Sequence, residues 1–490
     1  MSEWVPANVP VFTVVGRVNM GKSAVLATLL EIDDNKLIRV SPTPGETTRC
    51  QTHRLIFNDK ECIRFIDTPG FSQPIEAMRE IQRLHGEGTP GLDAIRSFVN
   101  ASDCSFVDEK RLLEPLLDGA GILYVVDPAR PLIDDFLAEM EILRWTGRPR
   151  LALLNRRENA TGNDEDAWKS RLGSAFNLTR TFDAHHARFE ERIRLLKALL
   201  EIEEHHREGL TETIRLVEDE WRIRREEAAE TIIEFLEDAL SLRVKTNLSE
   251  KDLALDSRRK RYTETLTKRY YSELAGLEQK CNSALLKIYR HHLLKADVDA
   301  TTYQKLDLES SETWSKWGLS RAQLVIAAGL TGGAAGLAVD AATGGITHGI
   351  GTLVGGLGSG IAAWFKGSSL PELRVNLHGG VTLDSGESKT LVIGPPSNRN
   401  FLWILMDAVL VRYQQILNRA HGRRDAQHLA DEGSGFTRHF SSSKRAVFGK
   451  WFDQCLKGNR SGPMEPEVFA ALVETLEEST SDHSGNSSAR

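Results

Sequence analysis

Two glycines, a lysine and a serine near the start of the chain stand at a spacing that suits phosphate chemistry. Residues 16–23 read GRVNMGKS and match the P-loop pattern G-x-x-x-x-G-K-S/T. Gly16 and Gly21 allow the loop to wrap closely, so that backbone N–H groups face phosphate oxygens. Lys22 can reach the β- and γ-phosphates, and the Ser23 hydroxyl is a ligand for Mg²⁺. The pattern therefore predicts a nucleoside-triphosphate site that uses Mg²⁺.

The segments on either side of this loop are the ones that must position it. Residues 9–15 form a short, apolar and β-branched run that is typical of a buried strand. Residues 24–30 form an apolar helical stretch. Because a P-loop needs a strand before it and a helix after it, this context favours a nucleotide site over a chance match.

A second strand brings further candidate groups to the same place. Residues 62–66 are strand-like and lead into DTPG at 67–70. Asp67 stands at the end of this strand, where a carboxylate can hold Mg²⁺ through a water molecule, and the N–H group of Gly70 can bind the γ-phosphate. Between the two motifs, residues 43–49 read TPGETTR, and their threonines can complete the shell of the metal.

These motifs resemble those of the Era/TrmE family of P-loop GTPases, which are related to translation factors. The family patterns G-R-x-N-x-G-K-S, T-T-R and D-T-P-G stand here at 16–23, 47–49 and 67–70. The resemblance implies that Thr48 is the switch I ligand of Mg²⁺ and that Asn19 helps to bind a catalytic K⁺. We therefore expect GTP hydrolysis that potassium stimulates.

The resemblance also predicts the character of the hydrolysis. In this family a hydrophobic residue follows D-x-x-G, and Phe71 fits that pattern. Because Phe71 has no polar group to orient the attacking water, we expect slow intrinsic hydrolysis that a partner, a dimer or a cation accelerates. The residues expected to act in catalysis are Lys22, Thr48 and Gly70. The nucleotide contacts expected in these motifs are Gly16, Asn19, Met20, Gly21, Lys22, Ser23, Ala24, Asp67 and Gly70.

The base-recognition motif departs from the family pattern N-K-x-D. The strand 151–154 leads to Asn155, Arg156 and, two residues later, Glu158. The resemblance implies that Asn155 braces the base pocket. It also implies that Arg156 supplies the long, positively charged side chain that lysine has in the family pattern. Glu158 either pairs with guanine through a carboxylate one methylene longer than aspartate or is an exposed loop charge. The nearest match to the fifth motif is residues 182–185.

The resemblance covers about residues 8–190 and implies an α/β P-loop GTPase domain over 1–190, with a mostly parallel sheet and flanking helices. Residues 191–315 are densely charged, and an apolar stripe at helical spacing predicts amphipathic or coiled-coil helices. The basic run 258–261 is interpreted as a solvated helix face in preference to a phosphate contact. The stripe consists of Ala228, Ile232, Phe235 and Ala239.

Residues 316–368 form an apolar, glycine-rich segment. Between Arg321 and Lys366 the only formal charge is Asp340, and glycines recur four residues apart. Such spacing gives a helix a flat face against which a second helix can pack closely. We expect a glycine-zipper helical hairpin over 322–365. The sequence leaves open whether this hairpin enters a bilayer or packs as a soluble element.

The last part of the chain combines a small β element with C-terminal helices over 369–475. Alternating apolar residues predict a β-hairpin that ends at Ile393, and helices are expected at 401–417 and around 447–456. The tail 476–490 is polar and is expected to be disordered. The whole arrangement resembles a group of bacterial Era-like GTPases whose C-terminal half is a helical, glycine-rich domain of unknown function.

Composition narrows the class of protein. The 490 residues carry a net charge of −7, which argues against nucleic acid as the main partner. Five scattered cysteines without a C-x-x-C pair, and an N-terminus without signal-peptide features, predict a cytoplasmic protein that is at most peripheral to or inserted at the inner membrane.

The leading functional hypothesis is a GTP/GDP molecular switch. Its helical region is expected to signal to an unknown protein effector, an inner-membrane protein being one candidate, or to the membrane through 322–365. A homodimer is a further candidate partner. The alternatives are a dynamin-like membrane-remodelling GTPase and a ribosome- or RNA-associated GTPase.

Overall fold

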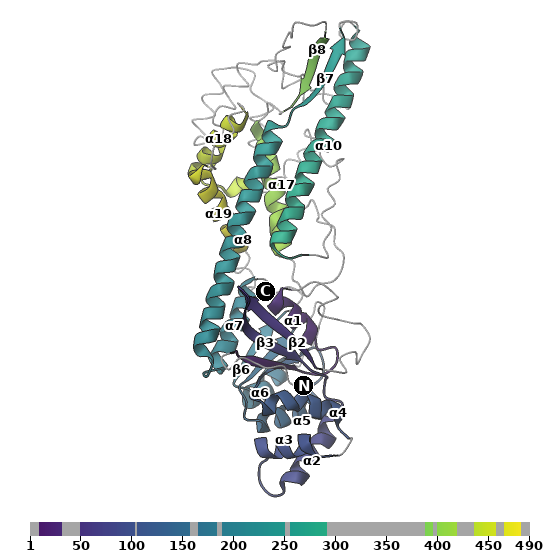
Figure 1. Ribbon diagram of the computed structural model, residues 1–490, viewed down its shortest axis with the longest axis vertical. Helices are drawn as coiled ribbons and strands as arrows, with labels where there is room; N and C mark the ends of the chain where they lie inside the picture. The colour runs from purple at the N-terminus through teal and green to yellow at the C-terminus, as the bar shows by residue number, and fades with distance from the viewer. Residues whose placement is uncertain are drawn as a thin grey trace. The chain divides into compact units, whose positions relative to one another are not determined.

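The computed structural model describes residues 9–31, 50–102, 105–156, 165–183, 189–249, 255–291, 388–394, 399–418, 436–456 and 465–481 (Figure 1). The chain divides into two compact units. The first comprises Met1–Ile223, Arg290–Leu293 and Leu417–Ala426, and the second comprises the remaining segments. The five domains expected from the sequence do not coincide with these two units, since the predicted 191–315 region belongs partly to each, and their boundaries stay predictions.

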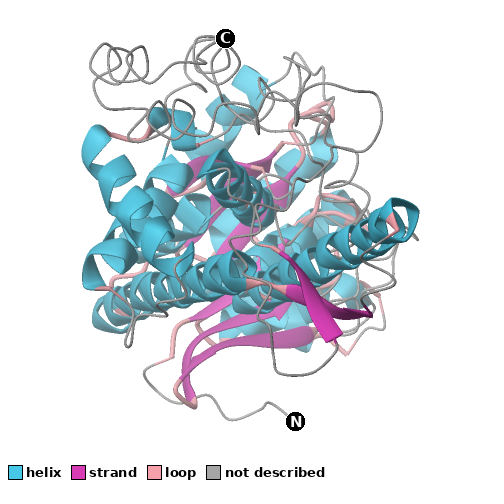
Figure 2. Cartoon of the chain, turned by 90° about the horizontal axis from the view of Figure 1, so that it is seen from above, coloured by secondary structure: helices cyan, strands magenta, loops and turns pink. Residues whose placement is uncertain are grey.

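A six-stranded sheet forms the centre of the first unit (Figure 2). Its strands lie in the order β2-β3-β1-β4-β5-β6, and every neighbouring pair is parallel except β2 with β3. The inner strands are buried along nearly their whole length, as continuous apolar runs covered on both faces should be. The expected α/β P-loop GTPase fold is therefore confirmed. The strands are β1 (Val11–Val15), β2 (Gln51–Phe57), β3 (Lys60–Asp67), β4 (Gly121–Val126), β5 (Arg150–Asn155) and β6 (Leu178–Phe182).

Seven helices among the described residues belong to the same unit as this sheet. Eight of the nine residues of α1 (Lys22–Leu30) are buried, so α1 is a core helix and not an amphipathic surface helix. Three helices, α2, α3 and α4, stand between β3 and β4, where α2 packs against α3 and α5, and α3 against α4. The helices are α1 (Lys22–Leu30), α2 (Pro74–His85), α3 (Leu92–Asn100), α4 (Val107–Leu117), α5 (Asp134–Trp145), α6 (Glu165–Ala175) and α7 (Phe189–Ile202).

The strand order places the loop after β1 at a topological switch point. Strand β1 lies between β3 and β4, which pair with its two opposite edges. The order of the strands along the chain therefore reverses at β1. In open α/β sheets ligands bind at such a point, outside the carboxyl ends of the strands. The P-loop follows β1, the DTPG motif begins at the end of β3, and the base-recognition motif begins at the end of β5. The fold therefore brings these three motifs to one edge of the sheet.

The second unit is mainly helical. Its long helices are α8 (Arg207–Ser241), within which the division between the units falls, and α10 (Asp256–Ile288). The predicted apolar stripe on α8 is buried, which confirms its assignment as a core-facing helix surface. The other described elements are α17 (Arg399–Leu417), η1 (Thr437–His439), α18 (Ser442–Leu456) and α19 (Pro466–Ser481).

The small β element differs from the predicted hairpin. The strand that ends at Ile393, β8 (Ser388–Ile393), is present, but its antiparallel partner is β7 (Val244–Ser249), in a region expected to be wholly helical. Gly394 after β8 has φ +106°, and a Cβ there would lie 2.4 Å from the Leu242 carbonyl oxygen, so only glycine fits this turn. The expected strands before residue 388 lie outside the described residues.

The predicted glycine-zipper hairpin 322–365 also lies outside the described residues. Within the parts of the chain that the structure describes, no helix combines the length and the apolar character needed to cross a bilayer.

Candidate nucleotide-binding site

Both P-loop glycines are required by close packing against the neighbouring strands. Gly16 has φ +146°, and a Cβ on it would lie 2.3 Å from the Val125 carbonyl oxygen of β4. Gly21 has φ +92°, and its Cβ would lie 2.2 Å from the Asn155 side-chain nitrogen at the end of β5. Any side chain at either position would therefore displace the loop from the sheet.

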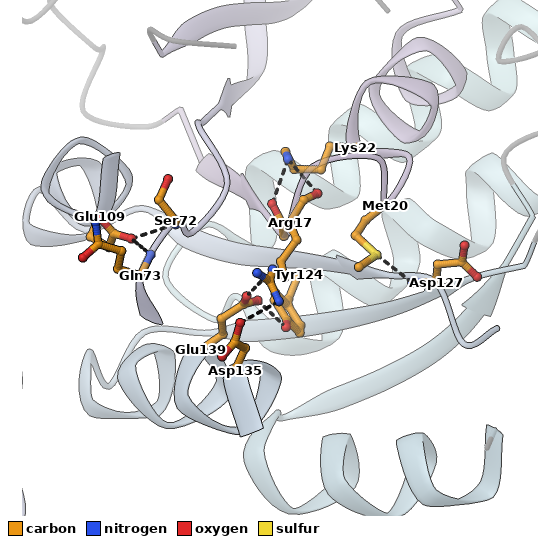
Figure 3. A network of polar contacts seen from close by, with 11 residues as sticks. Arg17, Met20, Lys22, Ser72, Gln73, Glu109, Tyr124, Asp127, Asp135 and Glu139 are labelled. Carbon is orange, nitrogen blue, oxygen red and sulfur yellow. Dashed lines mark hydrogen bonds and ion pairs between the residues drawn. The ribbon is translucent and has the colours of Figure 1, made fainter. Parts of the chain in front are cut away.

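The ammonium group of Lys22 lies over this loop (Figure 3). Its Nζ donates to the carbonyl oxygens of Gly16 at 2.7 Å and Arg17 at 3.2 Å. Burial lowers the pKa of Lys22, while the charges of Asp67 and Glu139 act in the opposite direction. Such a partly desolvated ammonium, which among the described residues donates to backbone carbonyls, can exchange these bonds for phosphate oxygens.

Asp67 at the end of β3 is a buried carboxylate. Burial raises the pKa of Asp67 to about 6, whereas the Lys22 charge and a hydrogen bond from Ser23 lower it. Its Oδ1 has no hydrogen-bond partner among the described residues. A buried carboxylate oxygen beside a hydroxyl is the oxygen donor set that Mg²⁺ takes, so Ser23 and Asp67 fit this ion.

Asn155 connects the predicted base pocket with the phosphate loop. It is fully buried at the end of β5, and its Nδ2 donates to the Met20 carbonyl oxygen at 3.0 Å. The Met20 sulfur in turn accepts the Asp127 N–H at 3.3 Å (Figure 3). The backbone N–H of Arg156 donates to the Phe182 carbonyl at 2.9 Å. The ends of β5 and β6, which carry the fourth and the nearest fifth motif, therefore lie together.

The other predicted residues are placed as follows. Gly70 lies against the P-loop, because a Cβ there would be 3.0 Å from the Gly16 carbonyl oxygen. Asn19 is exposed with φ +63°, and the Arg156 guanidinium pairs with Glu165 at 2.6 Å. Ala24 is buried in the first turn of α1. Thr48 and Glu158 lie outside the described residues.

Sequence reasoning missed a charged network behind the P-loop. Arg17 pairs with Asp135 at 2.9 Å and with Glu139 at 3.6 Å, both on α5 (Figure 3). The Tyr124 hydroxyl of β4 donates to Glu139 at 2.7 Å. Burial raises the pKa of the fully buried Glu139 to about 8. The only sequence signal was an acidic pair spaced by four residues on a helix, which is common on solvated surfaces.

Sequence reasoning also missed two carboxylates that contact the segment after Gly70. Glu109 accepts hydrogen bonds from the backbone N–H groups of Ser72 and Gln73 (Figure 3). Asp108 accepts one from the Ser72 hydroxyl. Both acidic residues stand in the first turn of α4, where acidic side chains are frequent for reasons of helix stability alone.

Two family models match separate parts of the chain. Residues 11–156 match the family model described as 50S ribosome-binding GTPase, and residues 169–472 match the model of a domain of unknown function (DUF3482). A variant of Era from Aquifex aeolicus bound to GDP·AlF₄⁻ is 20% identical, with a TM-score of 0.27 over 40% of this chain and 57% of that one.

A second solved structure covers more of the chain. NFeoB from S. thermophilus, bound to GDP·AlF₄⁻ and K⁺, is 17% identical, with a TM-score of 0.23 over 58% of this chain and 89% of that one. The chain spans just over half the length of the Era structures that it matches. The second family model covers more than half of the 490 residues. The chain therefore belongs to the family defined by this domain of unknown function (DUF3482), and its N-terminal part, residues 11–156, has a P-loop GTPase fold and matches the GTPase model.

Proposed function

We propose that this protein is a GTP-hydrolysing molecular switch. The observation that carries the proposal is the meeting of Lys22, Ser23 and Asp67 at one edge of the sheet, where one Asp67 carboxylate oxygen has no hydrogen-bond partner within the described part of the chain. A buried ammonium, a hydroxyl and a carboxylate beside a glycine loop are the groups that bind a triphosphate and its metal. When bound, Mg²⁺ would neutralise charge on the phosphates.

The protein's own residues would position the reacting groups. Lys22 would move from the Gly16 and Arg17 carbonyls to the β- and γ-phosphates, where its charge stabilises the transition state. Gly70, which lies against the loop, would turn its N–H toward the γ-phosphate. Phe71 is 3% exposed and offers no polar group to the attacking water, which supports slow intrinsic hydrolysis.

Guanine recognition is the next part of the proposal. Asn155 is already fixed by its bond to Met20, so the end of β5 has one defined geometry for holding a base. Glu158 would accept hydrogen bonds from N1–H and N2–H₂ of guanine, the role that aspartate has in the family pattern. Thr48 would complete the Mg²⁺ shell.

We expect hydrolysis to depend on K⁺. Asn19 is exposed in the P-loop and has a left-handed backbone conformation, and its amide oxygen would bind the cation beside the phosphates. Exchange of K⁺ for Na⁺ should lower the turnover of GTP at least fivefold in the wild type. The Asn19→Ala protein should show the same low turnover in both salts. Equal wild-type turnover in K⁺ and Na⁺ would remove the cation from the mechanism.

A switch must bind a partner in one nucleotide state only. We expect wild-type protein loaded with a GTP analogue to retain a partner from detergent-solubilised cells, and GDP-loaded protein to release it. The Lys22→Ala protein should retain none, because it does not hold the triphosphate. Detergent keeps an inner-membrane protein within reach of the capture. If no partner follows the nucleotide state, the switch model is wrong and the chain is a GTPase of another kind. Contact with a membrane through 322–365 stays a prediction from the sequence.

A further inference from the structure

The segment that joins β3 to α2 is anchored on both sides of Gly70. On one side the fully buried Thr68 hydroxyl donates to the Val14 carbonyl oxygen at 2.9 Å. On the other side Phe71 is buried in the core. Only residues 69 and 70 lie between these anchors. If this segment responds to the γ-phosphate, the backbone can therefore change mainly at residues 69 and 70.

Glu109 provides the strongest anchor on the α2 side. It is 1% exposed, and its Oε1 accepts the N–H groups of Ser72 at 2.7 Å and Gln73 at 2.6 Å (Figure 3). Gln73 is the N-cap residue of α2, yet its own side chain makes no capping bond. Glu109 thus caps α2 from a different helix.

The position of Glu109 explains how a carboxylate can be buried there. It stands in the first turn of α4 and faces the first turn of α2, so two helix N-termini direct their positive ends toward it. Two charge-assisted hydrogen bonds compensate for its lost hydration. Asp108 adds an exposed bond from the Ser72 hydroxyl at 2.8 Å.

We propose that Glu109 is a positioning residue for GTP hydrolysis. Its hydrogen bonds hold residues 71–73 against α4; we call this contact the latch. The backbone rearrangement on GTP binding is then confined to the peptide at Gly70, which already lies against the P-loop. This inference rests on the proposed function. Without the latch, residues 71–73 would have to be ordered during each turnover, which slows hydrolysis. Binding of GDP, which has no γ-phosphate for Gly70 to meet, would not change.

The test compares Glu109→Ala and Glu109→Gln with Glu114→Ala, an exposed position on the same helix. Glu109→Ala should lower kcat at least tenfold, while Kd for GDP stays within twofold of the wild type. Amide exchange of residues 71–76 in nucleotide-free protein should become at least tenfold faster. Glu109→Gln keeps a neutral acceptor oxygen, so a loss of about threefold in kcat is expected. Glu114→Ala should match the wild type throughout.

The outcomes separate the latch from the proposed function. If wild-type protein neither binds nor hydrolyses GTP, the proposed function fails, and the exchange measurement still shows whether Glu109 holds residues 71–73. If kcat and GDP affinity fall together, Glu109 supports the fold in general and the positioning role is wrong. If thermal melting shows that Glu109→Ala does not fold, Glu109→Gln decides, and wild-type kcat and exchange in that variant overturn the proposal.

Discussion

Replacement of Lys22 by alanine should lower kcat/KM for GTP by roughly a thousandfold, which corresponds to about 4 kcal/mol of lost transition-state stabilisation. The ammonium is buried, and within the described residues it donates to two backbone carbonyls of the loop that would bind the phosphates. Its charge is therefore available where negative charge develops on the γ-phosphate. Phosphate release from GTP measures the effect, with ATP as the comparison nucleotide.

The fold should survive the loss of Lys22. Burial of this charged ammonium costs hydration free energy, which lowers its pKa, so its removal also removes that cost, and water can bind the two carbonyls that it leaves. The melting temperature should stay within about 4 °C of the wild type. Gly21→Ala is the contrasting variant, because its Cβ would lie 2.2 Å from the Asn155 nitrogen, so both nucleotide binding and stability should fall. Wild-type turnover by Lys22→Ala would show that the reaction takes place elsewhere.

The phosphate loop and the strands around it could be predicted because their signals are local. The loop needs Gly16 and Gly21 for steric reasons, and these lie within one continuous motif between an apolar strand and an apolar helix. Asp67 stands directly at the end of a strand that pairs with β1, so its position followed from the parallel sheet. In each case one short window of sequence carried the signal, although the groups that Gly16 and Gly21 contact, Val125 and Asn155, lie on other strands.

The residues that sequence reasoning missed interact over long distances in the chain. Glu109 is separated by 37 positions from Ser72, and neither residue belongs to a motif. The β7–β8 ladder pairs Val244 with Ile393 across a segment that no local pattern links. Polar residues such as Glu109 and Glu139 look like ordinary helix-surface charges until the packing buries them. Their roles come from tertiary structure, which a hydrophobic pattern does not encode at polar positions.

The stability of the N-terminal domain should fall as the pH rises toward 8, because of Glu139. Burial raises its pKa in the folded state from 4.5 to about 8. Between these values the folded protein holds a proton that the unfolded chain releases, so the free energy of unfolding decreases with rising pH. At about 1.4 kcal/mol for each pKa unit, the decrease amounts to roughly 3 to 5 kcal/mol between pH 4.5 and 8. Glu139→Gln removes the ionisable group and should remove this decrease.

The free energy of unfolding can be measured by urea titration at pH 5, 7 and 9, with pulsed hydrogen exchange reporting on residues 121–145. The difference between the wild type and Glu139→Gln at each pH isolates the contribution of Glu139. Glu141→Gln is the matched control on the same helix, since a hydrogen bond from Arg144 lowers the pKa of Glu141 and its carboxylate is charged throughout this range. The control should follow the wild type with a constant offset. If Glu139→Gln instead loses stability relative to the wild type as the pH rises, the ion pair with Arg17 outweighs desolvation. Glu139 would then be a charged anchor of the P-loop at neutral pH.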